Sequence, residues 1–145
     1  MHIVVLEGSP NTKGSSNLLA AHFIEGAKAA GHSVEVYDLP KMSIGCIHCG
    51  YEGPCAIDDD VRQVRAAILR GDMIVFVTPL YYYGMSAQLK TMIDRFCAFN
   101  GSIQRKRLQS VLISAAWNDD EWTFDALEAH YDTLVRYLNL QDRSR

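Results

Sequence analysis

The chain has 145 residues, with 14 Lys and Arg against 17 Asp and Glu, so its formal net charge is −3 and its isoelectric point is about 5.9. Hydrophobic residues make up 48% and charged residues 21%, which is the composition of a folded globular domain and excludes a disordered or low-complexity chain. We therefore expect one domain over residues 1–145.

Charge and apolar patterning also limit the partners of the chain. The mild acidity argues against a nucleic-acid partner, because nucleic-acid binders carry a clustered basic excess. No apolar run reaches the about 18 residues that a membrane span needs. The apolar run Ile3–Leu6 is too short for the core of a signal peptide. We expect a cytoplasmic protein with no membrane partner.

The first third of the chain alternates between strand and helix patterns. His2–Gly8 holds an almost unbroken apolar run, rich in β-branched residues and too short for a helix, which predicts a strand buried on both faces. Ser15–Ala30 has apolar side chains three and four residues apart and is followed by Gly31, which predicts a helix that ends at a glycine. Ser33–Leu39 alternates apolar and polar residues, which predicts a second strand at an edge of the sheet.

The middle of the chain begins with a long loop after Pro40 that holds three of the four cysteines. Loops of that length in a compact domain are usually functional. Asp58-Asp59-Asp60 then opens a helix, since carboxylates in a first turn interact favourably with the helix dipole. Met73–Pro79 is almost entirely apolar and predicts a central strand, and Tyr81–Gly84 predicts a turn.

The last part of the chain repeats the alternation. Ser86 predicts the N-cap of a helix that ends at Asn100-Gly101, followed by a short solvated basic connection at Arg105-Lys106-Arg107. Leu108–Ala116 predicts a fourth strand. The acidic run that begins at Asp119 predicts the start of a final helix that runs to about Leu140.

This alternation of strands and crossover helices predicts an α/β fold, a doubly wound parallel sheet with right-handed crossovers. Domains of the flavodoxin-like type use five strands in the order 2-1-3-4-5, whereas only four are visible here, so we expect the order 2-1-3-4. The fourth strand, Leu108–Ala116, would then be an exposed edge, which proteins normally cover. Either the sequence lacks the last strand and helix of such a domain, truncated at the C-terminus, or another subunit covers the edge.

Ligands of open α/β sheets bind beyond the carboxyl ends of the strands, which directs attention to the loops after strands one, three and four. The first loop, Gly8–Asn17, places small residues and hydroxyls over a helix N-terminus, an arrangement that binds anions. A Walker A loop is excluded because Gly14 is followed by serines rather than by a lysine, and the Gly8–Gly14 spacing excludes a dinucleotide fingerprint. The pattern fits a cradle for one terminal phosphate, or else an ordinary capped helix.

The loop after the third strand contains three consecutive tyrosines, Tyr81–Tyr83, which cannot all face the core of the domain. They lie where a planar ring would lie if its phosphate occupied the first loop, and aromatic side chains flank such rings well. The alternative is a turn that packs on a neighbouring helix or on a partner subunit.

These two segments carry a family resemblance. Gly8-Ser9-Pro10 through Asn17-Leu18-Leu19, together with Pro79–Lys90 and Asp94-Arg95-Phe96, resembles the NAD(P)H-dependent FMN reductase family of flavodoxin-like proteins. Asn11 stands where members of that family often have an arginine. The resemblance implies that the FMN phosphate is held by Ser9, Asn11, Ser15, Ser16 and Asn17. It also implies that the isoalloxazine is lined by Pro79, Leu80, Tyr81, Tyr82, Tyr83, Gly84 and Met85, with a third wall from Ser114, Ala115, Ala116 and Trp117.

The resemblance further implies an oxidoreductase in which NADH or NADPH reduces the flavin and a small acceptor, such as a quinone, a nitro or azo compound or free flavin, takes the electrons. Because the flavin carries the chemistry, no catalytic side chain is expected, and we expect ping-pong kinetics and a homodimer or homotetramer. The alternatives are a flavodoxin-type electron carrier, for which a charge of −3 is mild, and a metal- or thiol-based redox regulator.

The cysteine loop, Cys46–Cys55, resembles the corresponding loop of iron–sulfur flavoproteins. A [4Fe–4S] cluster generally needs four thiolates, but Glu52 stands where one of the cysteines would fall, and Cys97 belongs to the apolar face of a helix. Three interpretations remain for this loop: a remnant without metal, a zinc or other metal site, or a redox-active thiol pair. The residues that it offers are Cys46, Cys49, Cys55 and His48. We expect no bound metal.

Overall fold

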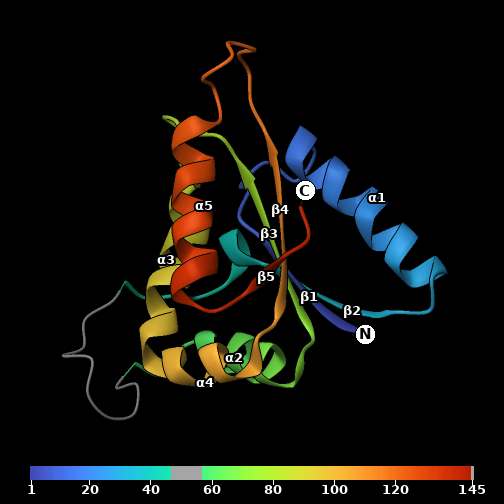
Figure 1. Ribbon diagram of the computed structural model, residues 1–145, viewed down its shortest axis with the longest axis vertical. Coiled ribbons are helices and arrows are strands. Elements are labelled where there is room, and N and C mark those ends of the chain that lie inside the picture. Colours follow the sequence, from blue (N-terminus) through green and yellow to red (C-terminus); the bar gives the residue numbers. More distant parts are fainter. Residues whose placement is uncertain (47–56, 145) are drawn as a thin grey trace.

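The computed structural model describes residues 1–46 and 57–144. In this part of the chain the sheet is parallel and five-stranded, in the order β2-β1-β3-β4-β5 (Figure 1). Its strands are β1 (His2–Glu7), β2 (Ser33–Asp38), β3 (Met73–Pro79), β4 (Gln109–Ala115) and β5 (Gln141–Asp142). The predicted α/β class and the order 2-1-3-4 are confirmed.

Helices cover both faces of the sheet. One face carries α1, and the other carries α2, α3, α4 and α5 (Figure 1), as right-handed crossovers in this strand order require. The helices are α1 (Ser15–Ala29), α2 (Val61–Arg70), α3 (Ala87–Asp94), α4 (Asn100–Lys106) and α5 (Asp125–Tyr137), with short 3-10 turns η1 (Leu39–Lys41) and η2 (Arg95–Phe99). No helix of the described ranges is long and apolar enough to span a membrane.

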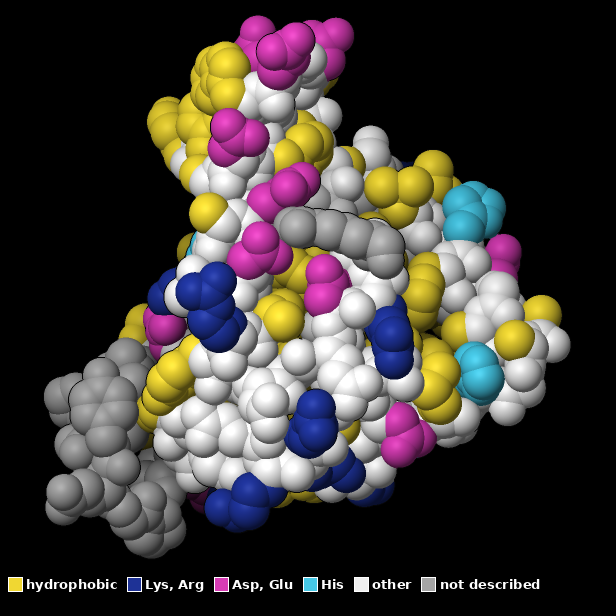
Figure 2. All heavy atoms as spheres, viewed as in Figure 1, with side chains coloured by type: hydrophobic (Ala, Val, Ile, Leu, Met, Phe, Trp, Pro, Cys, Tyr) yellow, Lys and Arg dark blue, Asp and Glu magenta, His cyan; other side chains and the backbone are white. Residues whose placement is uncertain are grey.

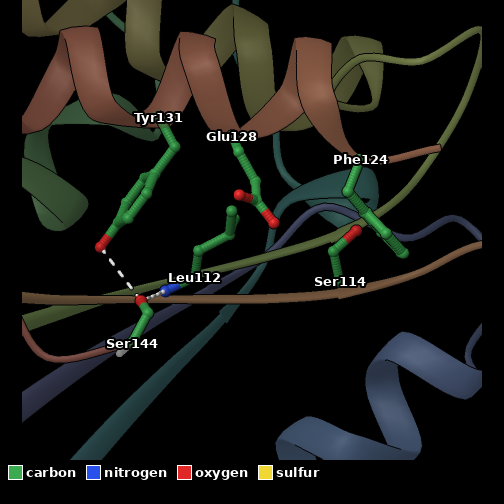
Figure 3. Close-up of a pocket in the computed structure, with 6 residues that line it drawn as sticks. All are labelled: Leu112, Ser114, Phe124, Glu128, Tyr131 and Ser144. Carbon is green, nitrogen blue, oxygen red and sulfur yellow. Dashed lines mark hydrogen bonds between the residues drawn. The ribbon is translucent and has the colours of Figure 1, made fainter. Parts of the chain in front are cut away.

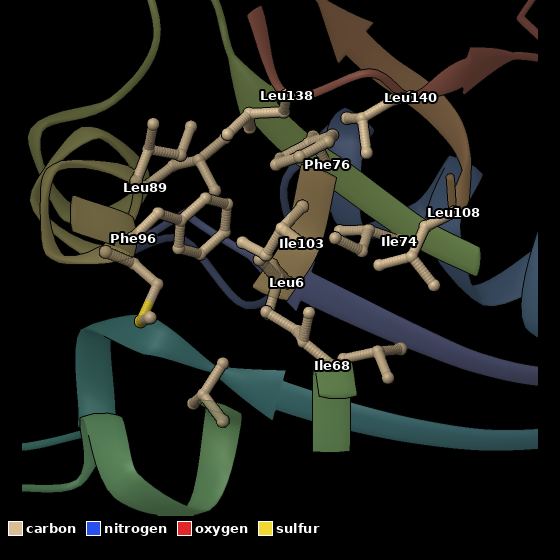
Figure 4. Close-up of a cluster of buried hydrophobic side chains, with 14 of the residues drawn as sticks. Leu6, Ile68, Ile74, Phe76, Leu89, Phe96, Ile103, Leu108, Leu138 and Leu140 are labelled. Atoms are coloured by element: carbon tan, nitrogen blue, oxygen red, sulfur yellow. The ribbon is translucent and has the colours of Figure 1, made fainter. Parts of the chain in front are cut away.

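The two central strands divide the core between these faces. Alternate residues of β1 and β3 point to opposite sides, so Leu6 and Phe76 face α2–α5 while Val5 faces α1. The ring of Phe76 lies 6.5 Å from that of Phe96 and 6.0 Å from that of Tyr131, which joins η2 and α5 to the sheet (Figure 4). Full burial of one such side chain contributes about 1.5–3 kcal/mol. The apolar runs predicted as central strands therefore form the centre of the sheet.

The expectation that the fifth strand is missing is wrong. After α5 the chain returns to the sheet, and Gln141 and Asp142 pair in parallel with Gln109 and Ser110 at the start of β4. This strand is two polar residues long and has no apolar run, so its sequence gives no strand signal. Its pairing ends quickly, because the amide of Leu112 donates to the hydroxyl of Ser144 (2.8 Å) instead of to a backbone carbonyl.

The boundaries predicted for two helices are also wrong. The helix that begins after Ser86 does not end at Asn100-Gly101, since the helical path continues through η2 and α4 to Lys106. Arg107, in the left-handed region (φ 52°), ends it, so the basic residues before it belong to α4 and not to a connection. The last helix begins at Asp125 instead of Asp119 and ends at Tyr137 instead of Leu140.

Candidate functional site

Three loops meet at the carboxyl edge of the sheet because β1, β3 and β4 are neighbours there. The amide of Gly8, after β1, donates to the carbonyl of Val77 in β3 (2.8 Å), and the amide of Leu80, after β3, donates to the carbonyl of Ala115 in β4 (2.9 Å). The structure therefore brings together the three segments that the sequence analysis selected.

A buried serine joins the first loop to the second. The Ser86 hydroxyl donates to the carbonyl of Gly8 (2.7 Å) and, as the predicted N-cap of α3, accepts from the amide of Leu89 (3.2 Å). The amide of Ser86 in turn donates to the hydroxyl of Thr78 (2.9 Å). A Cβ on Gly8 would lie 2.7 Å from both Leu89 Cβ and Ser86 Oγ, so glycine is required at this contact. Sequence patterns indicated the cap but not the bond to Gly8.

The first loop is shaped by its own hydrogen bonds. The Ser9 hydroxyl, almost fully buried, donates to the carbonyl of Asn11 and accepts from its amide (both 3.2 Å). The Asn11 side-chain oxygen accepts from the amide of Lys13 (3.1 Å), and the Asn11 carbonyl accepts from the amide of Gly14 (2.9 Å). Ser9 and Asn11 therefore fix the path of the loop toward α1.

The N-terminus of α1 is the part of the site best suited to an anion. Gly14 stands at the N-cap, and no side chain caps the first turn, so its amide groups are available to a ligand. Ser16 and Asn17 are buried here, and Asn17 Oδ1 has no hydrogen-bond partner among the described residues. Ser15 is exposed on the same turn. A buried acceptor without a partner costs about 1–3 kcal/mol, and a phosphate, which only accepts, does not offset this cost. The groups suited to a phosphate are the uncapped amides of this turn, which donate.

The second loop contains a tight turn. Tyr81 and Gly84 exchange two backbone hydrogen bonds of 3.1 Å, and between them Tyr82 (φ 46°) and Tyr83 (φ 63°) both lie in the left-handed region. This is the geometry of a two-residue hairpin turn, where Asn and Gly are the usual residues. All three tyrosines are exposed, which agrees with the prediction that they cannot all face the core. Before and after the turn, Pro79 and Leu80 are half-buried and Met85 is buried.

The third segment divides between two places. Ala115, the last residue of β4, accepts from the amide of Leu80 in the second loop, and Ala116 and the fully exposed Trp117 follow it. Ser114 instead lines a cavity of about 260 Å³ between β4 and α5 (Figure 3). Its hydroxyl has no partner among the described residues. The cavity is also lined by Leu112, Phe124, Glu128, Tyr131 and Ser144.

Tyr131 is the most buried ionisable group of this cavity. Its hydroxyl lies 2.9 Å from Ser110 Oγ and 3.0 Å from Asp142 Oδ1. Burial raises the pKa of Tyr131 to about 12, although its hydrogen bonds with Ser110 and Ser144 act in the opposite direction. The phenol therefore stays protonated at neutral pH and holds α5 to the sheet.

A carboxylate pair lies at the carboxyl edge near the first loop. Glu7 ends β1 and pairs in register with Asp38, which ends β2. Burial, and then the charge of Asp38, raise the pKa of Glu7, while Lys41 acts in the opposite direction. This negative charge next to the loop favours a phosphate position at the α1 N-terminus and away from β2.

The two ends of the cysteine loop are held by a buried ion pair. Asp59 accepts from the amide of Gly45 (2.9 Å) and from Arg95 Nη1 (2.5 Å), and the same Arg95 nitrogen donates to the carbonyl of Gly45 (2.9 Å). The side chains of Arg95 and Asp59 are 2% and 5% exposed. Arg95 thereby joins Gly45, just before the cysteine loop in sequence, to Asp59, just after it.

The cysteine loop itself lies mostly outside the described residues. His48, Cys49, Glu52 and Cys55 belong to the part that is not described, so the metal and thiol hypotheses for them stay untested. Cys46, at the start of the loop, is exposed. No group of three or more potential metal ligands occurs within residues 1–46 and 57–144.

The strand order and the three loops define a flavodoxin-like α/β domain with a candidate mononucleotide site. The chain belongs to the NADPH-dependent FMN reductase family, whose sequence model matches residues 1–128. The family inferred from the two loop segments is thereby confirmed, and with it FMN and NAD(P)H as the cofactors of the family.

Named relatives agree with this assignment. An iron–sulfur flavoprotein of Methanocaldococcus jannaschii is 33% identical over 99 residues, which are 66% of this chain and 51% of the relative. A putative NAD(P)H-dependent FMN-containing oxidoreductase of Bacillus subtilis is 30% identical over 96 residues, 66% of this chain and 52% of the relative. The chain thus spans about half the length of the curated relatives that it matches.

Solved structures share the fold. An NAD(P)H:quinone oxidoreductase from Methanothermobacter marburgensis superposes with a TM-score of 0.79 and 21% identity, over 98% of this chain and 80% of that one. An FMN-dependent NADH-azoreductase from Bacillus anthracis, in complex with FMN, superposes with a TM-score of 0.65 and 15% identity, over 98% of this chain and 85% of that one. At these identities the likeness shows the flavodoxin-like fold alone.

Proposed function

We propose that the protein is an FMN-dependent NAD(P)H oxidoreductase that passes electrons to a small acceptor such as a quinone, a nitro or azo compound or a flavin. The observation that carries this proposal is that three strand-end loops meet at one edge of the sheet and that the first of them leads into the uncapped N-terminus of α1. Family membership and relatives named as FMN-containing oxidoreductases support it.

In this proposal the first loop holds the phosphate of FMN. The amides of the first turn of α1 and the side chains of Ser15, Ser16 and Asn17 bind the phosphate oxygens, and the helix dipole adds a favourable charge interaction. Ser9 and Asn11 keep the loop in shape through their mutual hydrogen bonds.

The second and third loops line the ring of the cofactor. This group comprises Pro79, Leu80, Tyr81, Tyr82, Tyr83, Gly84 and Met85, with Ala115, Ala116 and Trp117 from the end of β4 and Ser114 behind them. When bound, FMN would provide the redox chemistry: it accepts a hydride from NAD(P)H and passes the electrons to the second substrate. The side chains of this protein bind the cofactor and orient its ring.

The proposal also includes a location in the cytoplasm and assembly as a homodimer or homotetramer.

Titration of the purified protein with FMN, followed by the quenching of flavin fluorescence, tests the binding site. We expect Asn17→Leu and Ser16→Ala to raise the Kd for FMN about tenfold or more each, since a hydrogen bond to a charged group is worth about 1.5–3 kcal/mol. Thr133→Ala, an exposed threonine on α5, is the control. A wild-type protein that binds no FMN would refute the proposal.

Steady-state kinetics tests the activity. We expect NAD(P)H oxidation in the presence of a quinone, with parallel lines in double-reciprocal plots, because donor and acceptor use the flavin in turn. Protein that binds FMN but does not oxidise NADH or NADPH would instead be an electron carrier.

A further inference from the structure

Two aromatic side chains from different loops meet at the edge of the proposed ring site. The ring of Tyr83, in the turn after β3, lies 5.0 Å from the ring of Trp122, in the loop after β4, at an interplanar angle of 39°. Tyr83 is 40% exposed and Trp122 is 51% exposed, so the pair leaves half of its surface open. Figure 2 shows hydrophobic side chains gathered on the projection at the top, where Figure 1 places the loop after β4.

The turn holds Tyr83 in a backbone conformation that a tyrosine does not favour. Positive φ angles at Tyr82 and Tyr83 bring the Cβ of each residue close to backbone carbonyl oxygen, which is why Asn and Gly predominate in such turns. Unfavourable conformations of this kind persist where the surrounding structure requires them, and they gather at ligand sites. Here the conformation presents a large exposed ring at the end of the sheet.

The loop that carries Trp122 is held in place. The side chain of Asn118 donates to the hydroxyl of the buried Thr123 (2.8 Å), and the amide of Thr123 donates to the carbonyl of Asp120 (2.9 Å). Trp122 therefore lies within this turn, and its carbonyl accepts from the amide of Asp125 (3.1 Å), the first residue of α5. Ordered, half-exposed aromatic side chains bind flat ring systems at little conformational cost.

We propose that Tyr83 and Trp122 bind the ring of the electron acceptor and so select flat aromatic acceptors. The inference rests on the proposed function and names the acceptor class within it. The overall reaction balances as NAD(P)H plus H⁺ plus quinone giving NAD(P)⁺ plus hydroquinone: the donor loses a hydride, and the quinone gains two electrons and two protons, one of them from solvent. The aromatic pair places the ring and takes no part in proton transfer.

Stopped-flow measurement of the two half-reactions tests this assignment. We expect Trp122→Ala and Tyr83→Ala each to lower the second-order rate constant for reoxidation by naphthoquinone about three- to tenfold, the effect of one lost aromatic contact. Reduction by NADH or NADPH and the Kd for FMN should change less than about twofold in Trp122→Ala. Tyr83 also lines the proposed flavin site, so Tyr83→Ala is measured at saturating FMN and its loss in reoxidation is compared with its loss in reduction. Trp122→Phe and Tyr83→Phe keep a ring and should retain most of the rate. Tyr137→Ala, an exposed tyrosine at the far end of α5, is the matched control.

Ferricyanide provides an acceptor without an aromatic ring. Two ferricyanide ions take one electron each, giving NAD(P)⁺, H⁺ and two ferrocyanide ions from one NAD(P)H. We expect Trp122→Ala to reduce ferricyanide at the wild-type rate, which also shows that it folds and binds flavin. Tyr83→Ala, measured at saturating FMN, should lose less of its rate with ferricyanide than with naphthoquinone. An equal loss with naphthoquinone and ferricyanide, an equal loss in both half-reactions, or no loss at all would overturn the inference. A wild-type protein inactive with every acceptor would refute the proposed function instead.

Discussion

Replacement of Asp59 by Asn tests the role of the buried ion pair that joins the two ends of the cysteine loop. The carboxylate accepts from both Nη atoms of Arg95 (2.5 and 3.3 Å), from the amide of Gly45 (2.9 Å) and from the amide of Val61 (3.2 Å). The variant keeps the shape of the side chain but removes the charge of Asp59 from the buried guanidinium. Breaking a buried pair in this way costs about 3–5 kcal/mol, a large part of the about 5–15 kcal/mol that stabilises a typical domain.

Urea unfolding followed by circular dichroism measures this loss. The matched control is Asp58→Asn, because the Asp58 side chain is 84% exposed next to the same loop end, and its loss should stay within about 0.5 kcal/mol. The double variant Asp59→Leu/Arg95→Met should recover much of the stability, since apolar replacement of a buried pair is often neutral. Equal effects of Asp59→Asn and Asp58→Asn would refute the reasoning.

The Asp59–Arg95 pair also makes the stability of the fold depend on pH. Burial alone would raise the pKa of Asp59, but hydrogen bonds from Arg95, Gly45 and Val61 outweigh it and hold the pKa below its ordinary range. A carboxyl group with a lowered pKa in the folded state stabilises the fold above about pH 4 and loses that contribution as the pH falls through the folded-state pKa. The stability of the wild type should therefore fall more steeply on acidification than that of Asp59→Asn.

Three further predictions concern other contacts. Gly8→Ala should lower the free energy of unfolding by about 1–3 kcal/mol in urea, because the new Cβ would lie 2.7 Å from Leu89 Cβ, and an unchanged midpoint would contradict it. Glu35→Gln should lower the thermal midpoint at pH 7, because hydrogen bonds from Arg70 and Tyr37 lower the pKa of Glu35. The difference from the wild type should shrink as the pH falls below about 4 and the carboxylate becomes protonated. The raised pKa of Tyr131 means that the phenol ionises at lower pH in the unfolded state than in the fold, so alkali destabilises the fold. Tyr131→Phe should therefore lose less stability than the wild type between about pH 10 and pH 12. An equal fall of the free energy of unfolding with pH in wild type and variant would count against this.

Much of the fold could be predicted because its signals are local. Local patterns suffice to predict β1 and β3, which are apolar runs, and α1, which has apolar residues at helical spacing. The strand order follows from the alternation of elements. The fifth strand could not be predicted, since Gln141 and Asp142 become a strand only by pairing with β4. The start of α5 was misplaced because the acidic residues from Asp119 resemble a first helical turn, whereas bonds to Thr123 stabilise a loop there.

The candidate site divides in the same way. The gathering of three loops follows from the rule for strand ends, so the position of the site was predictable. The contacts that fix it join residues far apart in sequence: Ser86 bonds to Gly8 across 78 positions, and Arg95 bonds to Asp59 across 36. One signal of the second contact was available, because Arg95 falls at helical spacing among apolar residues such as Met92 and Phe99, where a charge needs a buried partner.

The single hydroxyl shared between Gly8 and the start of α3 has a consequence for how the domain can evolve. Since the segment beside the proposed phosphate position and the segment beside the tyrosine turn share one buried hydrogen bond, neither can shift without the other. Substitutions at the two ends of a bound nucleotide should therefore show non-additive effects on its affinity. Changes that broaden the choice of oxidant are expected in the outer part of the loop after β4, which can vary without disturbing that bond.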